Sequence, residues 1–309
     1  MKKNIRKRTS LAGRAALLAV LFLALQVRAG VIFEKYSQYN HVQVIDNDGI
    51  RMLSFNGTSE TRMSITNPLQ GHFEYTEYFH MPWLWNHDMQ RVLMIGLGGG
   101  STQRSYQHYY TNVTVETAEI DPVVIDVAKK YFTVAETPHL QIRNLDGRVF
   151  LRRSTNRYDA IILDAYTTTR YGSSLPPHLT TREFFRLASE HMTTNGVLAY
   201  NVIGQTQGWQ QGIVAAIYRT LREVFPQVYL FPAVSSRNVV LIATKSPGRF
   251  DAARVQREAA DLVNAGILKL PAISDRLRSF VNLPPPAAAT CPVLTDAYAP
   301  VEALMSGYY

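Results

Sequence analysis

The sequence predicts an α/β fold with a parallel sheet, and three neighbouring stretches in the middle of the chain support this. Residues 92–95 form a short apolar run that is typical of a buried strand. Four glycines follow directly: Gly96, Gly98, Gly99 and Gly100. A helix is expected from about Ser101, and a second apolar run, residues 113–118, leads to Glu119. The order strand, glycine turn, helix, strand and acid is that of a βαβ unit.

This unit indicates a nucleoside-binding site. Glycines let the backbone approach a ligand, and the N-terminus of the following helix offers free N–H groups. An acid at the tip of the second strand can accept hydrogen bonds from both ribose hydroxyls. The spacing departs from G-x-G-x-x-G, so the glycines alone also fit a plain tight turn, but Glu119 favours the ligand site. We therefore expect Gly96, Gly98, Gly100 and Glu119 to bind a nucleoside-containing cofactor.

The region before this unit is predicted to be β-rich. Residues 31–70 contain alternating apolar positions, and two turn signals separate them, at 47–49 and at 56–57. We expect a small β-rich domain over residues 30–75 and a nucleoside-binding catalytic domain over residues 76–309.

The region after the unit continues the α/β pattern. A helix is expected over 122–132, and a strand over 139–143 leads to Asp146 and Gly147. The next strand, residues 159–163, ends in Asp164. Because ligands bind at the carboxyl ends of parallel strands, Asp164 should face the same crevice as Glu119. Further helices are predicted over 178–192, 209–225 and 251–264, and further strands over 197–202, 227–231 and 239–244. Residues 167–177 are expected to form a flexible segment that closes over the site.

The N-terminus carries most of the excess positive charge. Of the net charge of +8, seven positive side chains lie in residues 1–29, which contain no acid, so the remainder carries only +1. This distribution argues against a nucleic-acid-binding surface. The basic start, the apolar run 15–25 and the small Ala29 predict a signal peptide cleaved after Ala29. A signal peptide implies an exported or periplasmic protein. The alternatives are an uncleaved anchor that associates with the membrane, or a cytoplasmic chain with a wrongly assigned start.

The sequence gives little support for a metal site or a disulfide bond. His80 and His87 lie near each other in sequence but lack a second set of ligands at metal spacing, so we interpret them as ordinary polar residues and expect no metal. Cys291 is the single cysteine, which excludes an intramolecular disulfide.

Several motifs carry a resemblance to a known family. IGLGGGSTQR, AEIDPVVIDVAKKYF, LDGRVFL and YDAIILDAY occur in this order, and the similarity extends from about Tyr36 to Leu304. The chain resembles the spermidine synthases, which are polyamine aminopropyltransferases. The resemblance implies the Rossmann-like fold of S-adenosylmethionine-dependent methyltransferases with a small N-terminal β-hairpin domain. That domain would form one wall of the site and part of a homodimer contact.

The resemblance also implies roles for individual residues. Asp164 matches the acid that accepts a proton, and Asp146 with Gly147 matches the pair beside the adenine. The family's Tyr-Gln pair corresponds to Tyr39-Asn40, and its Tyr-His-Glu motif corresponds to Tyr75-Thr76-Glu77. The co-substrate would be decarboxylated or intact S-adenosylmethionine, and the partner a small-molecule amine. The residues expected to bind the amine substrate are Tyr75, Glu77, Tyr166 and Asp296.

The sequence departs from the family pattern at the amine end. Gly99 stands where the family has an acid in the glycine loop, Thr167 where it has a second acid after Asp164, and Thr76 where it has a histidine. The nucleoside half of the signature is kept, whereas the polyamine half is eroded. We expect poor use of putrescine and weaker discrimination against intact S-adenosylmethionine. Three functions remain: an aminopropyltransferase with an altered amine, a methyltransferase, or a nucleoside-binding module without turnover.

Overall fold

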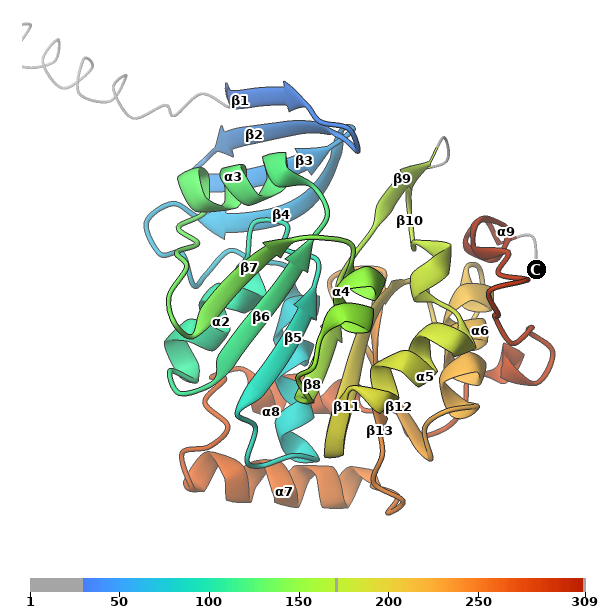
Figure 1. The fold of residues 1–309 in the computed structure, drawn as a ribbon. Helices are drawn as coiled ribbons and strands as arrows, with labels where there is room; N and C mark the ends of the chain where they lie inside the picture. The colour runs from blue at the N-terminus through green and yellow to red at the C-terminus, as the bar shows by residue number, and fades with distance from the viewer. Residues whose placement is uncertain (1–29, 170–171, 308–309) are drawn as a thin grey trace, which may run out of the picture.

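A computed structural model of the chain describes residues 30–169 and 172–307 (Figure 1). The predicted signal or anchor, residues 1–29, lies outside the described residues.

The N-terminal region forms a four-stranded antiparallel sheet, as the alternating pattern predicted. Its strands pair in chain order and are β1 (Gly30–Tyr36), β2 (His41–Asn47), β3 (Ile50–Phe55) and β4 (Thr58–Ser64). Asp48 and Asn56 have positive φ angles of 48° and 52°, as the tight hairpin turns require. Apolar side chains of this sheet pack against the helix α3 (Pro122–Tyr131), so the sheet is fixed on the rest of the molecule (Figure 1).

The centre of the molecule is a seven-stranded sheet whose order is β12-β13-β11-β8-β5-β6-β7. β13 is antiparallel to both of its neighbours, and the pairs from β11 to β7 are all parallel. The chain runs from β5 outward to β7 and then returns to β8 on the other side of β5. This reversal creates a switch point where ligands bind in open α/β sheets. The strands are β5 (Arg91–Ile95), β6 (Thr114–Glu119), β7 (Leu140–Asn144), β8 (Tyr158–Leu163), β11 (Met192–Ile203), β12 (Gln227–Pro232) and β13 (Asn238–Thr244).

Helices cover both faces of this sheet (Figure 1). Two clusters of buried apolar side chains lie between the sheet and these helices. One face carries α2 (Ser101–Tyr109), α3, the 3₁₀ helix η1 (Glu74–Leu84), α7 (Ala252–Asn264) and α8 (Ile273–Arg276). The other face carries α4 (Gly147–Arg153), α5 (Arg182–Glu190), α6 (Gln211–Arg222) and α9 (Val301–Met305). Three short 3₁₀ turns, η2 (Pro177–Leu179), η3 (Leu277–Ser279) and η4 (Pro286–Ala289), complete the described helices. The architecture confirms the predicted α/β fold.

The helix starts follow local sequence signals. Asp121 caps α3 because its side chain accepts a hydrogen bond from the N–H of Val123, and Pro122 occupies the first turn. The sequence did not predict α4, which begins after a similar cap at Asp146. The segment after Asp164 forms the short hairpin of β9 (Thr167–Thr169) and β10 (Gly172–Ser174), rather than an open loop.

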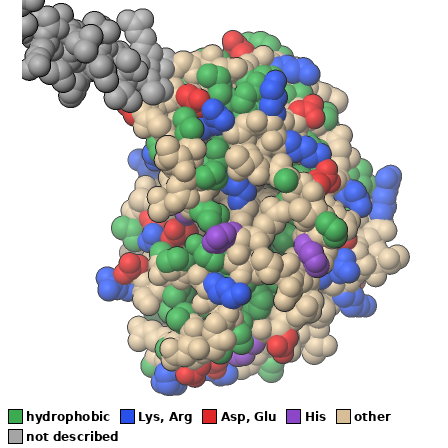
Figure 2. Space-filling model, turned by 90° about the vertical axis from the view of Figure 1, so that its left-hand side faces the viewer, with side chains coloured by type: hydrophobic (Ala, Val, Ile, Leu, Met, Phe, Trp, Pro, Cys, Tyr) green, Lys and Arg blue, Asp and Glu red, His purple; other side chains and the backbone are tan. Residues whose placement is uncertain are grey.

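The surface shows no dominant charge on the face drawn in Figure 2, where acidic and basic side chains are interspersed. Within residues 30–169 and 172–307, no helix is both long and apolar enough to cross a membrane. The same part of the chain contains no group of three or more metal-ligating side chains. His80 is buried there and hydrogen-bonded to Tyr110 and Ser105.

Candidate active site

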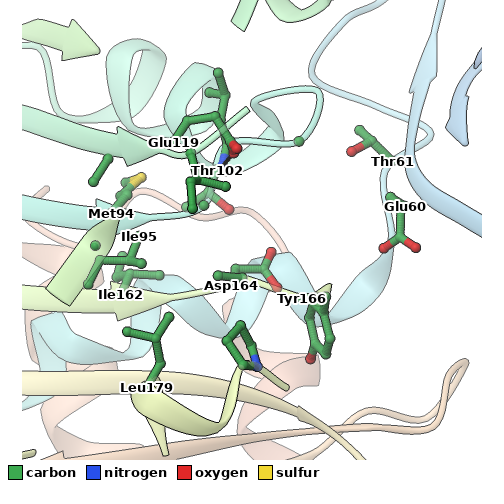
Figure 3. Close-up of a pocket in the computed structure, with 18 of the residues that line it drawn as sticks. Glu60, Thr61, Met94, Ile95, Thr102, Glu119, Ile162, Asp164, Tyr166 and Leu179 are labelled. Atoms are coloured by element: carbon green, nitrogen blue, oxygen red, sulfur yellow. Dashed lines mark hydrogen bonds between the residues drawn. The ribbon is translucent and has the colours of Figure 1, made fainter. Parts of the chain in front are cut away.

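A cavity of about 310 Å³ lies at the carboxyl ends of β5, β6 and β8, beneath the N-terminal sheet (Figure 3). The switch point of the sheet opens here, which is where the sequence pattern predicted the site. The residues predicted for the site that line this cavity are Tyr75, Gly96, Gly98, Glu119, Asp146, Gly147, Asp164 and Tyr166.

The glycine turn brings the ends of β5 and β8 together. Gly96 has a φ of 99°, and a Cβ atom there would collide with the backbone carbonyl of Asp164. Only glycine fits this position without displacing the end of β8, the neighbouring strand in the sheet. Gly100 has a φ of 70° and precedes α2, but it does not line the cavity. A Cβ atom added at Gly100 would collide with the side chain of Val134. Gly100 therefore shapes the start of the helix, and its contact with a cofactor stays a prediction.

Glu119 ends β6 with its carboxylate held by backbone N–H groups. Leu97 N–H donates to Oε2 and Asp121 N–H donates to Oε1, each at 2.9 Å. Burial raises the pKa of Glu119 to about 7, because the cost of desolvating the charge outweighs these two hydrogen bonds. Each oxygen retains a lone pair for a further donor. The carboxylate is thus oriented rigidly toward a cavity in which ribose hydroxyls would be suitable donors.

Asp146 and Gly147 follow β7, the neighbour of β6, and line the same cavity. One oxygen of Asp146 accepts from the N–H of Val149 at 2.9 Å, and the other lies 2.8 Å from Nε2 of His178. Burial alone would raise the pKa of Asp146, but His178 and the backbone donors outweigh it and lower the pKa. His178 also lines the cavity, although no sequence motif pointed to it.

Asp164 follows β8 and carries two hydrogen bonds from neighbouring side chains. Nδ2 of Asn201 donates to Oδ1 at 2.9 Å, and the Tyr75 hydroxyl donates to Oδ2 at 3.2 Å. Burial raises the pKa of Asp164 to about 6, despite these two donors. The Tyr166 hydroxyl donates to the carbonyl of Asn201 at 2.9 Å and so fixes the ring beside the acid. A carboxyl group with this pKa is suited to accept a proton near neutral pH.

Two predicted substrate residues lie elsewhere. Glu77 forms ion pairs with His72 at 2.9 Å and with Arg276 at 2.5 Å, and it lines a separate cavity beside α2. Asp296 pairs with Arg148 at 2.6 Å and accepts from Thr181 at 2.7 Å. Neither residue lines the main cavity, because each carboxylate is turned toward an arginine. Both ion pairs connect the C-terminal region to the rest of the molecule. The structure therefore does not bring these two residues into the main cavity, and their role in substrate binding stays a prediction.

The structure adds residues that the sequence did not single out. Glu60 and Thr61 of β4 enter the cavity from the N-terminal sheet (Figure 3). Thr61 accepts a hydrogen bond from the N–H of Gly99 at 2.9 Å, which joins this sheet to the glycine turn. Asn201 lies within β11 and is fully buried, and an amide inside the otherwise apolar run 197–203 was the only signal for it.

Comparisons with known proteins found relatives of this chain. A family model described as spermine/spermidine synthase domain matches residues 72–241. The polyamine aminopropyltransferase of Vibrio vulnificus is 28% identical over 301 residues, which cover 94% of this chain and 96% of the relative.

Two solved structures share the fold. A spermidine synthase in complex with the transition-state analogue AdoDATO superposes with a TM-score of 0.60 at 22% identity, over 80% of this chain and 88% of that chain. Human methyltransferase-like protein 13 in complex with SAH gives 0.54 at 21% identity, over 64% and 95% respectively. These likenesses establish the Rossmann-like, methyltransferase-type fold. Because the family model matches more than half of the sequence, the chain belongs to the spermine/spermidine synthase family.

Proposed function

We propose that this protein is a transferase that binds an S-adenosylmethionine-type co-substrate and transfers its aminopropyl group to an amine. The observation that carries the proposal is the position of Asp164, a desolvated carboxyl group in the same cavity as the glycine turn and Glu119. The nucleoside would lie between Glu119 and Asp146, with its sulfonium directed toward Asp164. The homodimer and the N-terminal export signal stay predictions beside this proposal.

The chemistry is a displacement at a carbon atom next to the sulfonium. The amine nitrogen forms a bond to that carbon while the carbon–sulfur bond breaks, and the sulfur leaves as a neutral thioether in methylthioadenosine. The nitrogen must first lose a proton, because an amine is a cation at neutral pH and has no free electron pair. Asp164 accepts this proton. Tyr75 and Asn201 hold its two oxygens, so the carboxylate cannot rotate away from the amine.

A methyltransferase is the second candidate, and one observation favours it. The glycine turn carries no acid, and Ser101, Thr102 and Gln103 at the start of α2 line the cavity with neutral polar groups. Free N–H groups at a helix N-terminus favour an anion. The carboxylate of intact S-adenosylmethionine would therefore meet no charge repulsion from the turn. In that case the transferred group is a methyl, and the acceptor again loses its proton to Asp164.

Product analysis separates the two functions. The purified protein is incubated with decarboxylated or intact S-adenosylmethionine and a panel of amines, and products are identified by mass spectrometry. The proposal predicts methylthioadenosine and an amine enlarged by an aminopropyl group. It also predicts that Asp164→Asn abolishes transfer while methylthioadenosine binding persists. Formation of S-adenosylhomocysteine and a methylated amine would establish the second candidate, and no product with any amine would refute both.

A further inference from the structure

Glu60 is a carboxylate of the N-terminal sheet that faces the amine end of the cavity. It is partly buried, and it accepts a hydrogen bond from Ser173 of the β9–β10 hairpin, whose Oγ lies 3.1 Å from Oε1. Among the described residues, no basic side chain forms an ion pair with it or contributes to its pKa. Within that part of the chain, Glu60 therefore lacks the counter-ion that buried charges ordinarily have.

The two positions that lack the family's acids behave differently in the structure. Gly99 does not line the cavity, and a side chain there would meet Thr61 and Phe132 at 2.7 and 2.9 Å. Thr167 does line the cavity, but its side chain is neutral. Among the described residues, the acidic side chains at the amine end are therefore Asp164 and Glu60. They reach it from different walls, one from the central sheet and one from the N-terminal sheet (Figure 3).

The surroundings of Glu60 suit an organic cation. Asp164, Tyr75 and Tyr166 lie close enough to interact with it electrostatically, and Ser173 completes the described groups that face it. Burial, followed by the charge of Asp164, raises the pKa of Glu60 to about 7 in the free protein. A positively charged ligand would favour ionisation of both acids, and the tyrosine rings offer cation–π contacts.

We propose that Glu60 determines acceptor specificity by binding the distant ammonium group of a diamine whose other nitrogen lies at Asp164. This role rests on the proposed function, and it supplies the second negative charge that Gly99 and Thr167 do not provide. The substrate class is a linear aliphatic diamine or polyamine. The eroded amine site expected from the sequence is then a rebuilt site, with its second carboxylate supplied by the N-terminal sheet.

The test compares two amines of equal length on the intact protein. Protein saturated with methylthioadenosine is titrated with putrescine and with 1-aminobutane, which lacks the second ammonium, at about pH 8. Glu60→Gln keeps an acceptor for Ser173 but removes the charge. It should weaken putrescine binding by at least about tenfold and 1-aminobutane binding by less than about threefold. The matched control is Glu34→Gln, a surface position on β1 of the same sheet, which should change neither affinity.

A second readout reports ionisation directly. Because the pKa values of both acids are raised in the free protein, putrescine binding at about pH 6.5 should release protons. Titrations in buffers with different ionisation enthalpies measure this release, which should be smaller for Glu60→Gln. Unchanged putrescine affinity, or an equal loss for both amines, would overturn the role of Glu60 and leave the proposed function standing. Wild-type protein that binds methylthioadenosine but neither amine would also overturn the role of Glu60, and the proposed function would then be decided by the product analysis with the wider amine panel.

Discussion

Replacement of Glu119 by glutamine tests whether a desolvated carboxylate forms the nucleoside end of the cavity. The pKa of Glu119 is raised from 4.5 to about 7, a difference worth about 3 kcal/mol at 1.36 kcal/mol per pKa unit. Between pH 4.5 and about pH 7, Glu119 therefore keeps its proton in the folded state but has lost it in the unfolded state. This contribution to stability is fully present below pH 4.5 and is lost as the pH rises through about 7.

The Glu119→Gln variant has no such titration. The difference in unfolding free energy between wild type and variant should therefore move by about 2–3 kcal/mol in favour of the variant between pH 5 and pH 8. Urea unfolding of both proteins at the two pH values measures it, and the titrations of Glu60 and Asp164 cancel because both proteins share them. The reasoning would be refuted if the difference in unfolding free energy between wild type and variant were the same at pH 5 and pH 8 within about 0.5 kcal/mol.

Ligand binding gives an independent measure of the same side chain. Under the proposed function, the ionised carboxylate would accept charge-assisted hydrogen bonds from ribose hydroxyls, each worth about 1.5–3 kcal/mol. Glu119→Gln should therefore weaken methylthioadenosine binding by at least about tenfold at pH 8. At pH 5 wild-type Glu119 is neutral, so the two affinities should approach each other. Calorimetry at both pH values decides this, with Glu34→Gln as the control.

Three further predictions concern the glycine turn and the C-terminal ion pair. Gly96→Ala should destabilise the protein by about 2 kcal/mol or more, because its Cβ meets the backbone of Asp164, and thermal unfolding measures the loss. Gly99→Asp restores the family's acid in sequence, yet it should lower the melting temperature and leave putrescine affinity unimproved; tighter putrescine binding would contradict the structure. Asp296→Asn should cost no more than about 1 kcal/mol, since its pair with Arg148 is partly exposed, and amine affinity should not change. Arg148 lowers the pKa of Asp296 to about 2, so this small contribution is lost as the pH falls through that value.

The strand-end acids could be predicted from the sequence because each follows an apolar run. Parallel strands carry their carboxyl ends to one edge, so Glu119 and Asp164 meet there whatever the details of the loops. Glu77 could not be placed in this way, because its environment depends on Arg276, which is 199 positions away in the chain.

Glu60 was missed for a related reason. It lies on an N-terminal strand, and its entry into the cavity depends on how that sheet packs on α3, which no local pattern encodes. Asn201 was missed because an amide within a strand carries no motif of its own. Most strands and helices of the central fold, and the meeting of the two strand-end acids, were therefore predictable. Helix α4, the β9–β10 hairpin and the contacts between the N-terminal sheet and the central fold were not.

The contact between Gly99 and Thr61 has an evolutionary consequence. The space that a side chain at Gly99 would need is already filled by a methyl group of Thr61 and by the ring of Phe132. A protein of this fold with an acid at this position would need this wall to lie farther away or to be built from smaller side chains. The effect of a substitution at any one of these positions depends on the residues at the other two, which is epistasis. Replacement of Gly99 alone by an acid should therefore destabilise the protein, whereas smaller side chains at Thr61 and Phe132 should reduce that cost.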